Sequence, residues 1–149
     1  MNTVFLPSYS VGSDVYNQIP KVCGAYGKTA VVIGGKTAIS KAKDALLAGV
    51  HNSNIEIIDF IWYGGDSTYA NIKKLAQNPQ FQKADMVFAV GGGRAIDTCK
   101  TLCDMENKPV FSFPTIASNC SPVTAVCVIY DDETHGFKEL YFPQKMPIT

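Results

Sequence analysis

The stretch FAVGGGRAIDTCK, residues 88–100, decides the fold. It opens as an apolar run typical of a buried strand, continues through three glycines, and ends in a segment with apolar residues at helical spacing. Because glycine has no Cβ, a ligand can approach the backbone of such a turn closely. The free N–H groups and the dipole of the following helix favour an anion, typically a phosphate, and Arg94 can add a charged donor. A tight turn with nothing bound is the structural alternative.

Strands and helices alternate around this unit. Apolar or β-branched runs predict strands at 29–33, 55–61, 86–90 and 109–113. Helical spacing predicts helices at 37–47 and 69–77, the second with Asp66 or Ser67 as its N-cap. This rhythm predicts an α/β fold, with a parallel, Rossmann-like open sheet and helices on both faces.

The last third of the chain changes character. Two β-rich segments, 124–130 and 137–142, flank the polar sequence DDETHG at 131–136. This pattern predicts a β-hairpin near the C-terminus. Because the sequence ends at 149 soon after the hairpin, we expect it to be one part of something longer.

Composition excludes several function classes. The 149 residues suit one domain, with 46% hydrophobic residues, 17% charged residues and a formal net charge of zero. We therefore expect no nucleic acid or membrane partner, and the absence of a basic leader favours a cytoplasmic protein. Five cysteines without a CxxC pair argue against a disulfide framework or a zinc site, and Cys99 and Cys103 are expected to be buried. His51 and His135 are expected at the surface.

The glycine turn also carries a family resemblance. GGGRAIDTCK at 91–100 resembles the motif GGGKxxDxAK of the iron-containing alcohol dehydrogenase superfamily. PTIAS at 114–118, followed by VIY at 128–130, is similar to the glycerol dehydrogenase branch. The resemblance implies that 1–149 is an N-terminal dinucleotide-binding domain that uses NAD or NADP. It also implies that a C-terminal helical domain, which carries the ligands of a zinc or iron ion, is absent from this chain.

The same resemblance assigns roles to particular residues. Gly93 to Asp97 would wrap the cofactor pyrophosphate, although Asp97 could instead be an acid that stabilises the first turn of its helix. Thr115 and Ser118 would touch phosphate, ribose or the nicotinamide side. The nicotinamide pocket would be lined by Thr124, Val126 and Tyr130. The full set of expected cofactor contacts is Gly35, Lys36, Gly91, Gly92, Gly93, Arg94, Ala95, Ile96, Asp97, Thr115, Ser118, Thr124, Val126 and Tyr130.

Three positions depart from the family pattern. Arg94 replaces a lysine, which keeps the charge but changes the geometry. Cys120 replaces an Asp that binds substrate hydroxyls, as in a hydroxycarboxylate dehydrogenase branch that reduces 2-oxo acids; alternatively the thiol is a small buried filler. Where NAD-preferring members carry an Asp, residues 34–36 read GGK, so a 2′-phosphate could fit and pair with Lys36, unless Lys36 is an ordinary surface lysine.

Two functions from different classes follow. The first, which the resemblance implies, is the NAD(P)-binding domain of a metal-dependent oxidoreductase that transfers hydride between nicotinamide and a small alcohol, polyol or 2-hydroxy acid. Alternatively the chain is a truncated, non-catalytic nucleotide-binding module. Dehydroquinate synthase shares this N-terminal architecture, so a lyase-like protein is a third possibility. The fragment alone is expected to hold no catalytic residue and no metal and to be inactive, whereas the whole enzyme is expected to be a homo-oligomer.

Overall fold

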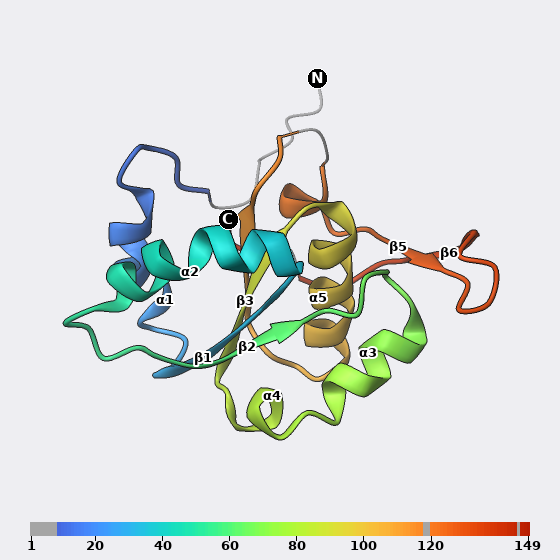
Figure 1. The fold of residues 1–149 in the computed structure, drawn as a ribbon, viewed down its shortest axis with the longest axis horizontal. Helices are drawn as coiled ribbons and strands as arrows, with labels where there is room; N and C mark the ends of the chain where they lie inside the picture. Colours follow the sequence, from blue (N-terminus) through green and yellow to red (C-terminus); the bar gives the residue numbers. More distant parts are fainter. Residues whose placement is uncertain (1–8, 118–119, 146) are drawn as a thin grey trace.

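A computed structural model describes residues 9–117, 120–145 and 147–149. Four parallel strands form the central sheet (Figure 1): β1 (Thr29–Gly34), β2 (Glu56–Trp62), β3 (Met86–Gly91) and β4 (Val110–Pro114). Their order across the sheet is β2-β1-β3-β4. The helices are η1 (Val15–Gln18), α1 (Ile19–Cys23), α2 (Lys36–Val50), α3 (Tyr69–Ala76), α4 (Pro79–Lys83), α5 (Gly93–Met105) and η2 (Ser121–Val123).

Helices cover both faces of the sheet. Successive side chains of a strand point to opposite faces, so Val31 and Val32 on β1 belong to different cores. The core on the Val31 side is completed by α3, α4 and α5, whereas the core on the Val32 side is completed by α1 and α2. The central strands β1 and β3 are thus buried on both faces, as parallel strands usually are. The predicted α/β fold with a parallel sheet and helices on both faces is confirmed.

The predicted hairpin is also present, as β5 (Cys127–Tyr130) paired with β6 (Phe137–Tyr141) in a separate antiparallel sheet. It packs beside α5 through the buried side chain of Ile129. The expected strand at 124–130 was too long by three residues. In the structure, the Val126 carbonyl accepts a hydrogen bond from the Lys100 ammonium group at 2.7 Å, ahead of the strand.

No local pattern in the sequence predicts that residues 147–149 pair with the edge of the sheet. The Ile148 carbonyl accepts a hydrogen bond from the Ser112 amide at 2.7 Å, and the Ile148 amide donates to the Val110 carbonyl at 3.2 Å. These bonds form a parallel bridge on the open edge of β4. An edge strand presents unpaired backbone groups, and this short segment satisfies some of them.

The start of α3 differs from the prediction. Thr68, rather than Asp66 or Ser67, is the N-cap, because its hydroxyl accepts a hydrogen bond from the Asn71 amide at 3.2 Å. Gly64 and Gly65 precede Thr68 with φ values of +108° and +96°, a backbone region that residues other than glycine rarely adopt. Asp66 therefore does not cap α3, and its side chain instead contacts Arg94 and His135 from distant segments.

Candidate nucleotide-binding site

The strand order creates a switch point between β1 and β3. These neighbouring strands are followed by helices on opposite faces, α2 after β1 and α5 after β3. In open parallel sheets, a crevice forms where the connections diverge in this way, beyond the carboxyl ends of the strands. Gly34 and Gly91 end the two strands. A Cβ on Gly34 would lie 2.0 Å from the Val90 carbonyl oxygen, so the strand ends meet at a spacing that only glycine permits.

A hollow of about 230 Å³ opens at this switch point. Glycines from both strand ends border it, together with the first turn of α5. The first N–H groups of a helix have no partner within the helix, and they carry the positive end of its dipole. The hollow therefore offers an anion a glycine backbone and a helix N-terminus. Its lining residues are Gly35, Ala38, Tyr63, Gly91, Gly92, Gly93, Arg94 and Ala95.

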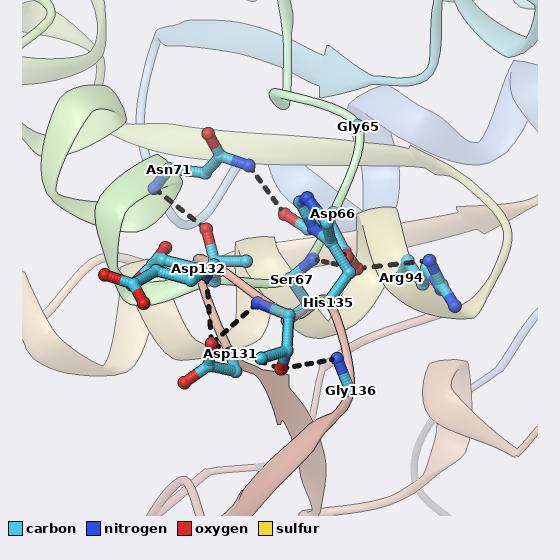
Figure 2. A network of polar contacts seen from close by, with 12 residues as sticks. Gly65, Asp66, Ser67, Asn71, Arg94, Asp131, Asp132, His135 and Gly136 are labelled. Carbon is cyan, nitrogen blue, oxygen red and sulfur yellow. Dashed lines mark hydrogen bonds and ion pairs between the residues drawn. The ribbon is translucent and has the colours of Figure 1, made fainter.

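Arg94 lies at the border of this hollow and of a second one next to it, of about 540 Å³. Its guanidinium Nη1 is 3.3 Å from Oδ1 of Asp66, and its Cζ lies 4.5 Å from the centre of the Tyr130 ring. On the other side of Asp66, the Oδ2 atom is 3.4 Å from Nδ1 of His135 (Figure 2). Arg94 is thus near the glycine turn, as expected, but its charge already faces a carboxylate.

A buried polar network joins α5 to the segment before the hairpin. Lys100 is only 1% exposed. Its ammonium group donates to the Ser121 carbonyl at 2.8 Å and to the Val126 carbonyl at 2.7 Å. It also lies 3.4 Å from Oδ1 of Asp97. The Ser121 hydroxyl donates to that same oxygen, and Oδ2 of Asp97 accepts a hydrogen bond from the Val128 amide at 2.9 Å.

The sequence left two roles open for Asp97, a cofactor contact or an acid that stabilises the first turn of its helix. The structure shows a third role for its side chain. Its oxygens are bound to Lys100, Ser121 and Val128, so the carboxylate anchors the segment beside the site. A contact from Asp97 to a cofactor stays a prediction. Within the hollow's lining, the structure brings together Gly35 and residues 91–95 as expected.

The other predicted residues that the structure describes are not part of the lining of this hollow. Lys36 is exposed, with its ammonium group 4.5 Å from the centre of the Trp62 ring at the end of β2. The Thr115 amide donates to the Gly91 carbonyl at 3.1 Å, which holds the loop after β4 against the glycine turn. Cys120 is exposed rather than a buried filler, and its carbonyl accepts a hydrogen bond from the Thr124 hydroxyl at 3.0 Å. Ile96 is buried in the core, and Ser118 lies outside the described residues.

The thiols within the core are structural, as expected for Cys99 and Cys103. Both are fully buried, and burial raises the pKa of each thiol well above its ordinary value. His135 and His51 are exposed, as expected. Among the described ranges, no three His, Cys, Asp or Glu side chains are grouped so as to hold a metal ion. Over the same ranges, no helix has the length and apolar character needed to cross a membrane.

Sequence reasoning missed three residues that organise the site. The sequence predicts Asp66 only as a candidate N-cap and assigns Ser121 no individual role. Lys100 was quoted within the glycine motif without a function, although its spacing from Ile96 and Cys103 places it on the buried face of α5. A charged residue on a buried helix face is the signal that could have revealed the network, because such a charge requires partners.

The fold and the site together define an α/β domain whose parallel sheet carries a glycine-rich turn at its switch point. The chain belongs to the iron-containing alcohol dehydrogenase family, whose model matches residues 7–149. It is 27% identical over 135 residues to a glycerol dehydrogenase of Escherichia coli, an alignment that covers 91% of this chain and 36% of that protein. It is 30% identical over 153 residues to a glycolaldehyde reductase of Halobacterium salinarum, with 99% of this chain and 40% of that protein covered.

Solved structures agree on the fold. The crystal structure of glycerol dehydrogenase from Schizosaccharomyces pombe superposes with a TM-score of 0.81 at 21% identity, over 98% of this chain and 37% of that one. The chain thus spans well under half the length of these relatives. The resemblance drawn from the glycine motif is confirmed at the level of the family.

Proposed function

We propose that this chain is the NAD(P)-binding domain of a metal-dependent oxidoreductase that acts on a small alcohol, polyol or 2-hydroxy acid. One observation carries the proposal: the glycine turn and the N-terminus of α5 border a hollow at the switch point of the sheet. Such a place suits the pyrophosphate of a dinucleotide, because backbone N–H groups and the helix dipole favour its negative charge.

The residues present fit this cofactor. Gly92 borders the hollow, and a Cβ there would come within 3.1 Å of the Ile116 side chain, so a larger residue would crowd the turn. In the proposed complex, Gly92 and Gly93 hold the pyrophosphate, and Thr115 lies beside them. Thr124, Val126 and Tyr130 line the nicotinamide side. The bound cofactor would supply hydride chemistry, while these residues bind and orient it.

A metal does not fit the part of the chain that the structure describes, since no suitable group of side chains is present there. We therefore propose that a zinc or iron ion is held by a helical domain outside these 149 residues, and we derive no step through it. The proposed whole enzyme is a cytoplasmic homo-oligomer, and residues 1–149 are its N-terminal domain.

Binding of the cofactor tests the proposal directly. Isothermal titration calorimetry of the 149-residue chain with NADH and with NADPH is expected to show saturable binding of at least one of them. ADP-ribose, which lacks the nicotinamide, is expected to compete because it retains the pyrophosphate. Absence of binding by all three ligands would rule the proposed function out.

Gly35→Asp is expected to shift the cofactor preference toward NADH. Gly35 has extended backbone geometry, and a Cβ there would meet nothing closer than 4.0 Å, so the aspartate side chain fits. The new carboxylate would repel a 2′-phosphate and accept a hydrogen bond from a 2′-hydroxyl, with a shift of about 1–3 kcal/mol. The unsubstituted chain is expected to bind NADPH at least as well as NADH, with Lys36 as the partner of the 2′-phosphate. A strong preference of the unsubstituted chain for NADH would contradict this.

The substrate prediction rests on Cys120. A polyol would lack a charge-assisted hydrogen bond at this position, a loss of about 1.5–3 kcal/mol, whereas an anionic 2-oxo acid would escape a repulsive carboxylate. The complete enzyme is therefore expected to turn over 2-oxo or 2-hydroxy acids better than glycerol, and Cys120→Asp is expected to move activity toward polyols by roughly ten- to hundredfold in kcat/KM. Steady-state kinetics on both substrate classes measures this, and a clear preference of the unsubstituted enzyme for glycerol would show the idea to be wrong.

A further inference from the structure

Asp66 is held in place by hydrogen bonds from residues that follow it in the chain. Its Oδ1 atom accepts a hydrogen bond from the Ser67 amide at 2.9 Å, and its carbonyl accepts one from Nδ2 of Asn71 at the same distance. The two preceding glycines, 64 and 65, have positive φ values, and a Cβ on Gly64 would collide with the Asn71 side chain. The geometry of the turn and these hydrogen bonds therefore hold the Asp66 carboxylate in one position.

The carboxylate lies between the Arg94 guanidinium and the His135 imidazole, both of which are much more exposed than the carboxylate. The Asp66 side chain is 10% exposed, whereas those of Arg94 and His135 are 54% and 68% exposed. A buried carboxylate is costly unless it is paired, so Asp66 favours a conformation in which Arg94 stays beside it. In Figure 2, Arg94 and His135 reach Asp66 from two different elements, the start of α5 and the hairpin loop.

The position of Arg94 connects two ends of the proposed cofactor site. Arg94 follows the glycine turn directly, and its guanidinium group covers the ring of Tyr130 on β5. The segment that carries Asp66 reaches the same strand, because the Ser67 carbonyl accepts a hydrogen bond from the Tyr130 amide at 2.8 Å. Asp66, Arg94 and Tyr130 thus link the β2–α3 turn, the phosphate end of the site and the hairpin.

We propose that Asp66 is a positioning residue for the cofactor: it holds Arg94 against Tyr130 and away from the pyrophosphate, and so keeps the hairpin placed for the nicotinamide end. This inference rests on the proposed function. A free guanidinium beside a bound pyrophosphate would turn toward the phosphate oxygens, since a bidentate contact to phosphate is strong. The Tyr130 ring would then lose its contact with Arg94. Contacts to the phosphates would strengthen, and contacts to the nicotinamide would weaken.

The test compares NADH with ADP-ribose on the same variants. Asp66→Asn keeps an oxygen that can accept from the Ser67 amide but removes the charge that holds Arg94. It is expected to leave ADP-ribose affinity unchanged or raised, while the advantage of NADH over ADP-ribose falls by about two- to fivefold, the range of a half-exposed ion pair. Asp132→Asn is the matched control. Asp132 borders the hollow of about 540 Å³ that Asp66 and Arg94 also border, and its side-chain oxygen can still accept the hydrogen bond from the Ala70 amide after the change. It is expected to leave the ratio unchanged.

A second background separates positioning from a general structural effect. In Arg94→Met, the further change Asp66→Asn is expected to have no effect on the ratio, because the group that Asp66 positions is gone. Arg94→Lys, which keeps the charge but not the planar contact with Tyr130, is expected to lower the ratio with Asp66 intact. An unchanged ratio in Asp66→Asn, or an equal effect in both backgrounds, would overturn the inference alone. A parent chain that binds neither ligand would overturn the proposed function and this inference with it.

Discussion

Replacing Lys100 by methionine is expected to lower the free energy of unfolding by about 3–5 kcal/mol, the usual cost of breaking a buried charge pair by removing one partner. The Lys100 ammonium group is surrounded by the Ser121 and Val126 carbonyls and by Asp97, and the residue is 1% exposed. Methionine fills a similar volume but donates nothing. The variant leaves a buried carboxylate without its cation and two carbonyls without this donor. Urea unfolding followed by circular dichroism measures the change.

Two further variants show whether the charge is responsible. Lys108→Met removes a lysine whose ammonium group also donates to two carbonyls, those of Gln82 and Ala84, but with part of it open to solvent. We expect a loss of only about 1 kcal/mol there. Adding Asp97→Asn to Lys100→Met removes the unpaired carboxylate and should recover part of the stability. A Lys100→Met effect no larger than that of Lys108→Met would show that the network contributes little.

Gly92→Val is expected to reduce NADH and NADPH binding by at least about a hundredfold, the loss of two or more charge-assisted hydrogen bonds to phosphate. Gly92 is the N-cap of α5, with a φ of −88° that valine can adopt, so the backbone itself is not strained by the change. Gly92 borders the hollow, and the valine Cβ would lie 3.1 Å from Cδ1 of Ile116. We therefore expect the valine side chain to take up space that the proposed pyrophosphate needs.

Gly136→Val provides the matched control for that variant. Gly136 lies in the hairpin loop, where a Cβ would make an ordinary contact at 3.5 Å with Oγ1 of Thr134. It is expected to retain NADH affinity within about twofold, the size of a typical surface effect. Thermal unfolding of both variants establishes that they are folded. Unchanged calorimetric binding in folded Gly92→Val would contradict the assignment of the glycine turn.

Local pattern was sufficient for the strands of the sheet and for the glycine turn at its switch point. The apolar runs before Gly34 and Gly91 gave strands within a residue or two of those observed, since a strand buried on both faces has a continuous apolar sequence. The glycines after them marked a turn and the start of a helix, because those positions depend on backbone geometry within a few residues. For the same reason the family motif at 91–100 could be read directly from the sequence.

Partners far apart in the chain were out of reach of this reading. The pairing of Asp66 with Arg94 and His135 depends on how the β2–α3 turn, α5 and the hairpin pack together, as does the contact of Lys100 with Ser121 and Val126. The return of Ile148 to the edge of β4 is equally non-local. By itself, the sequence determined the alternation of strands and helices and the glycine turn, because periodicity and backbone freedom are local properties. Only the tertiary structure decided which charges meet, because a buried charge takes its partner from whatever the packing of distant segments places beside it.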